Sequence, residues 1–207
     1  QSLNIVYSDA TKGWLPLEDD VVADEPVALP TQKGIFGFGG GSSPTNLVSS
    51  SGVIASDTTR VGTAREQLGA ASYGGDKAIF GYGTGSTNIT NLVSNSGVVS
   101  ADVTGVGTAR GALAGVGYGN DKAIFGFGEL TGGNTGITNL VSNSGVVATD
   151  TAAVATARYG VGAASYGGDK AAFAYGDTGS NVNTRNLVNN SGVVASDATG
   201  AGTGRRF

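Results

Sequence analysis

One stretch of the chain reads Gly81-Tyr82-Gly83, then Asn91-Leu92-Val93-Ser94-Asn95-Ser96-Gly97-Val98-Val99, then Gly107-Thr108-Ala109-Arg110, and it occurs four times with small changes. Self-similarity at a short period is typical of repeat proteins, in which a small unit stacks on copies of itself. Lysines at intervals of 44, 45 and 48 residues mark the starts of the units, namely Lys33, Lys77, Lys122 and Lys170. The sequence therefore predicts a repeat array over residues 32–207, with units 33–76, 77–121, 122–169 and 170–207.

Length variation within the units is confined to one place. An asparagine precedes an arginine by 19 residues in every unit, and each of the first three arginines precedes the next lysine by 12 residues. In contrast, the gap from the glycine that closes the first strand to that asparagine is 7, 8, 11 and 10 residues. A connection that tolerates insertions is typical of an exposed loop, and in a repeat array such loops gather on one face.

Composition favours an all-β unit. Gly accounts for 37 of 207 residues and charged residues for 14%, against usual shares of roughly 7% and 25%. Short runs between turn signals predict four strands, which in the second unit lie near residues 77–83, 91–95, 97–101 and 113–118. Gly74-Gly75-Asp76, Gly119-Asn120-Asp121 and Gly167-Gly168-Asp169 each precede an opening lysine, so the last strand of one unit is expected to form a hairpin with the first strand of the next.

The order of these segments resembles the kelch repeat, the four-stranded blade of a β-propeller. The matching residues are Ile79-Phe80-Gly81-Tyr82-Gly83, Gly107-Thr108-Ala109-Arg110 and Ala112-Leu113-Ala114-Gly115-Val116. This sequence departs from the family where the third strand carries Val98 in place of an aromatic residue, and where the double glycine survives only as Gly39-Gly40. The resemblance implies a kelch-like β-propeller of four four-stranded antiparallel blades and no particular function.

A second resemblance lies in the style of the repeats and in Tyr7-Ser8-Asp9-Ala10-Thr11-Lys12-Gly13-Trp14. Both look like virion structural and tail-fibre-like proteins of tailed bacteriophages. The resemblance implies a virion location, with a secreted or cell-surface protein as the alternative.

Residues 1–31 differ from the array in charge. They carry six acidic groups and one lysine, net −5, while residues 32–207 carry ten acidic and eleven basic groups, net +1. We expect a short strand near residues 3–7, followed by an acidic linker. Because the fourth unit lacks a last strand, this strand is expected to complete the fourth blade, with homo-oligomerisation as the alternative.

The nearly neutral array argues against a nucleic-acid groove, which needs a clustered basic surface. No apolar run approaches the length of a membrane span. The chain has no Cys and no His, so thiolate metal sites and histidine general bases are excluded. Recurring carboxylates are better explained as turn or hydrogen-bonding residues than as acid/base pairs: Asp57, Asp102, Asp150 and Asp197, and Asp76, Asp121 and Asp169. We expect no enzymatic activity and no catalytic, cofactor or metal site.

Two sets of repeated side chains invite functional interpretations. Arg65, Arg110, Arg158 and Arg205 can surround an axis and hold an anion, but we favour a structural role in which they bridge blades by bonding backbone carbonyls or aspartates. Truncating Arg110 should then destabilise the fold. Phe36, Phe80, Phe125 and Phe173, together with Tyr82 and its equivalents, are expected to form the core between blades rather than sugar-stacking platforms.

Function is expected in the variable loops, residues 40–45, 84–90, 129–138 and 177–185. The candidate contact residues are Ser42, Ser43, Ser86, Thr87, Asn88, Asn134, Thr135, Asn181 and Asn183. Their side chains suit bonds to other virion proteins or to a host-surface glycan. Three functions compete: a non-enzymatic virion appendage such as a fibre, knob or capsid-surface component, a carbohydrate-binding propeller, and a purely structural repeat.

Overall fold

A computed structural model of the chain describes residues 5–9, 13–16, 34–40, 44–59, 61–85 and 87–207. The described residues form antiparallel β-sheets and contain no helix, which confirms the all-β prediction. The chain divides into two units, Gln1–Gln32 and Lys33–Phe207. Each is described separately below.

In the amino-terminal unit, β1 (Ile5–Asp9) pairs with β2 (Gly13–Pro16) in a two-stranded antiparallel sheet. The expectation that a strand near residue 5 completes the last blade is therefore wrong: the partner of β1 is β2, and the last sheet of the array is built from other strands. Pairing across a short connection closes a small loop, which costs less conformational entropy than pairing across the whole array.

The array contains four successive sheets. The first is β3 (Gly34–Gly37) with β4 (Thr45–Val48); the second is β5 (Gly69–Tyr73), β6 (Lys77–Gly81) and β7 (Thr90–Val93). The third is β8 (Ala114–Tyr118), β9 (Lys122–Gly126) and β12 (Thr138–Val141); the fourth is β13 (Gly162–Tyr166), β14 (Lys170–Ala174), β15 (Thr184–Val188) and β16 (Ala198–Thr199). A small hairpin, β10 (Glu129–Leu130) with β11 (Gly133–Asn134), projects from the third unit.

Each sheet takes its first strand from the end of the preceding sequence unit. Tyr73 pairs with Lys77, and the equivalent residues of the next two sheets pair in the same way, so the predicted hairpins are confirmed. Both residues that follow Tyr118 are in the left-handed region, with φ of 59° at Gly119 and 69° at Asn120. Glycine and asparagine adopt this conformation most readily, which explains why these turns carry them.

The strand expected near residues 97–101 is not a continuous strand. It contacts β7 only through isolated bridges, Val93 with Val99 and Thr90 with Val103. Between them, side chains replace part of the ladder: the Asn91 amide donates to the Ser100 carbonyl at 3.1 Å, and the Leu92 amide N–H donates to the Ser100 hydroxyl at 2.9 Å. Such side-chain bonds compete with regular strand pairing, so the expected four-stranded blade becomes three strands and an irregular edge.

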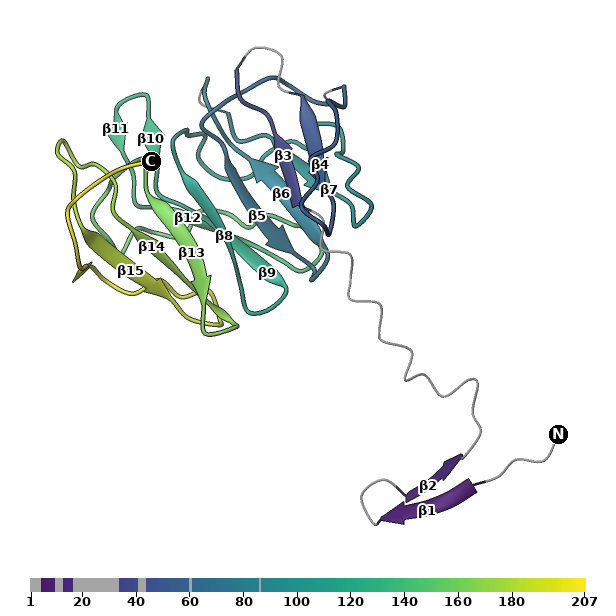
Figure 1. Cartoon of the computed structure of the whole chain (residues 1–207). Coiled ribbons are helices and arrows are strands. Elements are labelled where there is room, and N and C mark those ends of the chain that lie inside the picture. The colour runs from purple at the N-terminus through teal and green to yellow at the C-terminus, as the bar shows by residue number, and fades with distance from the viewer. Residues whose placement is uncertain (1–4, 10–12, 17–33, 41–43, 60, 86) are drawn as a thin grey trace. The chain divides into compact units, whose positions relative to one another are not determined.

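The sheets stack in chain order, with β5, β8 and β13 side by side along one edge (Figure 1). The hairpins at the ends of these strands are bonded together, because Gly74 N–H donates to the Asp121 carbonyl at 2.6 Å and Gly119 N–H to the Asp169 carbonyl at 2.7 Å. The first and fourth sheets lie at opposite ends of the array in Figure 1. Among the described residues the array is therefore open, and the expected closed four-bladed ring is not formed.

Aromatic rings fill the space between sheets. Phe80, Phe125 and Phe173 are buried, each packed edge-to-face on an aromatic ring of the preceding unit with centroids 5.1–5.3 Å apart. Burying one such side chain contributes about 1.5–3 kcal/mol. The prediction of a core between sheets is confirmed for these residues and for Tyr82, which is fully buried. It is wrong for Phe36, which is 61% exposed because no described sheet precedes it.

Candidate functional site

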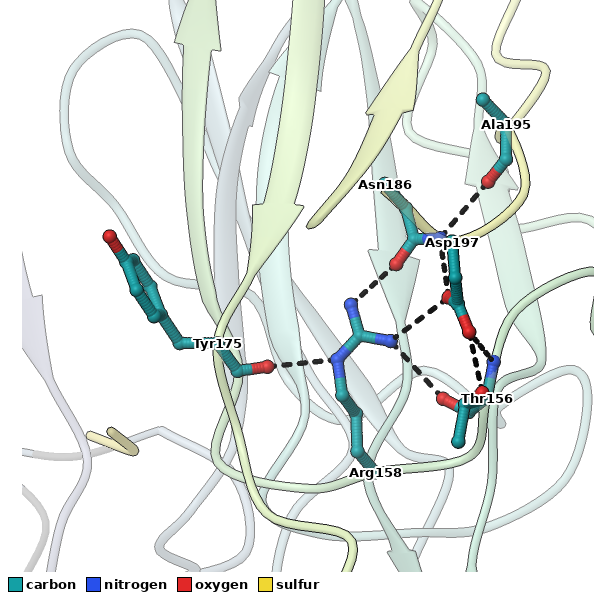
Figure 2. Close-up of polar contacts among 6 residues, drawn as sticks. All are labelled: Thr156, Arg158, Tyr175, Asn186, Ala195 and Asp197. Carbon is teal, nitrogen blue, oxygen red and sulfur yellow. Dashed lines mark hydrogen bonds and ion pairs between the residues drawn. The ribbon is translucent and has the colours of Figure 1, made fainter. Parts of the chain in front are cut away.

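The arginine that ends each constant segment is the centre of a hydrogen-bonded cluster. Figure 2 shows the one around Arg158, whose Nε donates to the Tyr175 carbonyl at 2.8 Å and Nη1 to the Thr156 carbonyl at 3.1 Å. Its Nη2 donates to the side-chain oxygen of Asn186. Tyr175 and Asn186 belong to the following unit, so the guanidinium group joins two sheets.

Asp197 completes the cluster (Figure 2). The Asn186 amide donates to Asp197 at 2.9 Å and to the Ala195 carbonyl at 3.1 Å. Asp197 in turn accepts bonds from the backbone N–H and the hydroxyl of Thr156, in the preceding unit. Arginine, asparagine, aspartate and threonine thus form a closed loop across the junction, which we call the junction clamp.

The clamp recurs at the other two junctions with similar distances. Arg65 bonds the Tyr82 carbonyl at 2.7 Å and Asn91 at 2.7 Å, and Arg110 bonds the Phe127 carbonyl at 2.9 Å and Asn139 at 2.7 Å. The aspartates that close these clamps are Asp102, bonded to Thr63, and Asp150, bonded to Thr108. The constant spacing from asparagine to arginine places one residue on each side of consecutive junctions.

Burial shapes the electrostatics of the clamp. Arg110 and Arg158 are fully buried and Arg65 is 4% exposed. Desolvation lowers the pKa of the Arg65 guanidinium, and the nearby Asp102 carboxylate opposes that effect. Desolvation also acts to raise the pKa of Asp102, but hydrogen bonds from Thr63 and Asn91 outweigh it and hold this pKa below its ordinary value. The clamp therefore keeps a cation and an anion charged inside the junction.

Each guanidinium group also lies over an aromatic ring of its own unit. The distances from Cζ to the ring centroid are 4.4 Å for Arg65 over Phe38, 4.3 Å for Arg110 over Tyr82 and 4.0 Å for Arg158 over Phe127. Such cation–π contacts are stabilising, and more so when desolvated. They offset backbone strain, because the aromatic residues themselves adopt a left-handed φ of about 63°, as Tyr82 and Phe127 show.

The phenol of Tyr82 adds a further bond to this layer. Burial raises its pKa to about 12, so the hydroxyl stays protonated and donates to the Val106 carbonyl at 3.0 Å. This bond fixes the segment that leads from the irregular edge back to the arginine.

The clamp geometry decides between the two interpretations of the arginines. Arg65, Arg110 and Arg158 are buried and bonded to protein acceptors, which agrees with the bridging interpretation and leaves no open anion pocket at these positions. Asparagine was missing from the predicted set of partners, although its constant spacing to arginine was the available signal. Arg205 differs: it is exposed, and its Cζ lies 3.6 Å from the centroid of the Tyr175 ring.

The acidic residues of the hairpins lie elsewhere, at the opposite ends of β6, β9 and β14. Asp76, Asp121 and Asp169 form ion pairs with the lysine that follows each of them, at 2.6, 3.4 and 2.8 Å. These pairs are solvent-exposed, so each contributes little to stability. Within the described residues no group of acidic side chains is arranged to hold a metal ion.

The predicted contact loops are only partly open to a partner. Ser42, Ser43 and Ser86 lie outside the described residues. Asn88 donates to the Gly107 carbonyl at 2.8 Å, and Asn183 makes the equivalent bond to Gly200 at 3.0 Å. These two asparagines therefore fasten their own loops to the irregular edge.

The third and fourth loops contact each other. The third loop folds into β10 and β11, and the Asn134 amide donates to the Asp177 carbonyl at 3.2 Å. Thr135 is 7% exposed, whereas Asn181 is exposed next to the tip of the fourth loop. Thr87 caps its loop by accepting a bond from Ile89 N–H at 3.2 Å. Of the predicted contact residues that the structure describes, Asn181 is thus the most accessible.

A shallow depression, which the sequence did not reveal, lies where β5, β8 and β13 approach their hairpins. It has a volume of about 120 Å³ and is lined by polar side chains and glycines, among them Ser72, Asn120, Lys122 and Ser165. Tyr73 and Tyr118 border it, but each is only 4% exposed, so their rings offer no open face for stacking. The sequence signal was the equivalent position of Ser72, Gly117 and Ser165 in the three edge strands.

Comparison of the chain with protein families and with curated proteins finds no match. Among the described residues there is no helix of the length and apolar character needed to cross a membrane. The site geometry is therefore the basis for the functional argument.

Proposed function

We propose that this chain is a non-enzymatic virion appendage, a fibre, knob or capsid-surface component, whose array of kelch-like blades is a rigid mount for contact loops. One observation carries the proposal: every junction between sheets is closed by a junction clamp, and no described side chain has a buried polar atom without a hydrogen-bond partner. Such an array resists bending between units, and chemical variation is confined to one face. The partner is another virion protein or a host-surface glycan.

The role as a mount depends on where the sequence varies. Asn88 and Asn183 anchor the bases of their loops, while the tip of β10–β11 and the region around Asn181 remain available. A stiff base with exposed polar tips is the arrangement that gives loops specificity without reorganisation on binding.

Two measurements test the proposal. Mass spectrometry of purified virus particles from the source of this sequence should detect the chain, and labelling with an antibody in the electron microscope should place it on the particle surface. Its absence from the particles, with the protein found in the surrounding medium or on cells, would overturn the virion assignment.

The depression at the hairpins supports a second candidate, a carbohydrate-binding protein. Hydroxyl, amide and ammonium groups converge there in a geometry suited to sugar hydroxyls, although no open aromatic face is present. A glycan array tests this candidate. Binding that is lost in Lys122→Ala and Ser165→Ala variants but kept in a Glu129→Ala variant favours the depression, and no binding to any glycan rejects it.

A further inference from the structure

The two end sheets of the array present faces that interior sheets bury. We call the face of the first sheet the head; it carries Phe36, Asn46, Gly52 and Asp57. We call the outer face of the fourth sheet the tail; it carries Tyr166, Tyr175, Leu187, Thr203 and Arg205. Every one of these residues is equivalent in the repeat to a residue that contacts a neighbouring unit at the interior junctions.

The head exposes an aromatic ring that has a partner everywhere else. Phe36 is 61% exposed, whereas its equivalents Phe80, Phe125 and Phe173 are 4%, 0% and 0% exposed. At the interior junctions this ring packs on the aromatic residue of the preceding unit, as Phe125 does on Tyr82. The residue equivalent to Tyr82 in the fourth unit is Tyr175, which is half-buried on the tail.

The head also carries half of a junction clamp. The Asn46 amide donates to Asp57 at 2.8 Å and to the Ala55 carbonyl at 3.1 Å, as in the complete clamps. Among the described residues, however, no arginine reaches the Asn46 side-chain oxygen and no threonine donates to Asp57. The head therefore presents acceptors for one guanidinium group and one hydroxyl group.

The tail carries the other half. Arg205 stacks on Tyr175, and its carbonyl accepts a bond from Gly176 N–H at 2.8 Å, as the carbonyls of the interior arginines do from their own units. Yet within the described part of the chain neither the Arg205 guanidinium group nor the Thr203 hydroxyl forms a hydrogen bond. The donors that the head lacks are present on the tail.

A third contact is incomplete at both ends. At interior junctions a turn glycine sits against a leucine of the preceding unit, so that a Cβ on Gly145 would lie 3.0 Å from Leu92. On the head, Gly52 has nothing within 4 Å of its Cβ position. On the tail, Leu187 is 37% exposed and Tyr166 is 40% exposed, although the equivalent Tyr73 and Tyr118 are 4% exposed.

We propose that the tail of one copy binds the head of a second copy and forms a fourth junction clamp from Arg205 and Thr203 of one chain and Asn46 and Asp57 of the other. The occupant is identified by complementarity, since a cation with two aromatic rings on one face meets an anion with an exposed phenyl ring on the other. The contact is heterologous, so repeated addition gives a closed ring or an open filament. This inference is independent of the proposed virion location.

Two substitutions in the tail bear on the strength of the contact. The phenyl ring of an interior junction rests on a cross-strand pair of small residues: Gly69 with Gly81, and Ala114 with Gly126. On the tail the pair is Gly162 with Ala174, which keeps one glycine as the third sheet does. Arg185 replaces the threonine found at this position in the other units, and its guanidinium group is within the class that stacks on a phenyl ring. We therefore expect the contact between copies to be weaker than an interior junction.

Sedimentation velocity of the full chain over a range of concentrations tests the proposal. The chain should sediment as oligomers whose size grows with concentration. Phe36→Asp and Arg205→Glu should each be monomeric, and an equimolar mixture of the two should form a 1:1 dimer and nothing larger, because only one intact head and one intact tail remain. Val98→Asp and Lys122→Glu, which make the same charge changes away from both faces, should associate as the unaltered chain does.

Folding and the alternative of a capped end are controlled separately. Phe36 and Arg205 are exposed, so both variants should keep the circular dichroism spectrum and melting temperature of the unaltered chain. A variant with Ala174→Gly and Arg185→Thr restores the interior pattern and should associate more tightly. The proposal is overturned if the unaltered chain is monomeric up to millimolar concentration, including the case in which only the restored variant associates, since the tail is then a cap. Association that the Phe36 and Arg205 variants retain also rejects it.

Discussion

Arg110 and Arg205 occupy the same position of two units, and their surroundings differ in almost every respect. Arg110 is fully buried between the second and third sheets and holds three acceptors, whereas Arg205 is exposed and keeps only the ring of its own unit. The sequence around the two residues is nearly identical, so the difference comes from the neighbouring sheet. An interior junction therefore contributes stability that no single unit has, which is the behaviour expected of a stacked array.

The largest effect is expected when the clamp is cut in the interior. Arg110→Ala leaves Asn139 and two backbone carbonyls without a donor inside the junction, which should destabilise the fold by about 3–5 kcal/mol. Arg205→Ala should change stability by less than about 1 kcal/mol, as is usual for exposed residues. Urea denaturation followed by circular dichroism checks both, and equal losses would contradict the comparison.

A smaller effect is expected at the glycines that receive the phenyl rings. A Cβ on Gly126 would lie 2.8 Å from the Phe173 ring, while the Cβ position of Gly132 has nothing within 4 Å. Gly126→Ala should cost about 1–3 kcal/mol through overpacking, and Gly132→Ala should be nearly neutral. Thermal melting of the two variants measures the difference. A neutral Gly126→Ala would mean that the junction is looser than the ring positions indicate.

The pH dependence of the interior clamps follows from their aspartates. Desolvation acts to raise the pKa of Asp150, but bonds from Thr108 and Asn139 outweigh it, and the pKa lies below its ordinary value. A carboxyl group whose pKa is depressed by folding contributes stability above its unfolded pKa of about 4. That stability is lost as the pH falls through the lower folded value.

Unfolding measured between neutral pH and strongly acidic pH checks this expectation. The unaltered chain should lose stability below about pH 4, and Asp150→Asn should lose less over the same interval, starting from a lower stability at neutral pH. Parallel curves for the two proteins would show that the clamp carboxylate does not contribute through its charge.

The smallest effect on stability is expected at the variable loops. Replacing residues 129–138 with the shorter loop 84–90 removes β10–β11 and the Asn134 bond to Asp177, an effect of roughly 1 kcal/mol and a few degrees in melting temperature. On the proposed function, the same exchange should abolish adsorption to host cells or incorporation into particles. If both persist, while substitutions at the opposite hairpin end remove them, the contact face is the hairpin end.

The repeat pattern was sufficient for the parts of the fold that local chemistry controls. Glycine and asparagine after Tyr118 predict the hairpin into β9, and the alternation through Phe80 predicts which rings enter the core. The irregular edge was not predictable in this way, because Ser100 fits a strand by sequence and bonds Leu92 and Asn91 only once the sheet is formed. Phe36 was misplaced for a similar reason: its sequence repeats the core pattern, but its burial depends on a sheet that is not there.

The candidate site was predictable to the same extent. The constant spacing marked Arg110 as structural, yet the partner Asn139 lies 29 residues away in the next unit, and only the stacking of the sheets brings the two together. The loop asparagines had the composition of contact residues, but Asn88 and Asn183 face inward because backbone carbonyls near them would otherwise lack a donor. The depression at the hairpins depends on three strands from different units and has no continuous sequence signal.

The offset between sequence units and sheets has a consequence for how such a chain changes over generations. Each sheet begins with a strand that the preceding unit encodes, and Tyr73, Tyr118 and Tyr166 all enter the same hairpin. Unequal recombination between two copies of the repeat in the gene therefore joins a first strand to an equivalent second strand, wherever the crossover falls. The product has one sheet more or fewer, with every remaining junction clamp intact, so the length of the array is a heritable variable that evolution can alter in a single step.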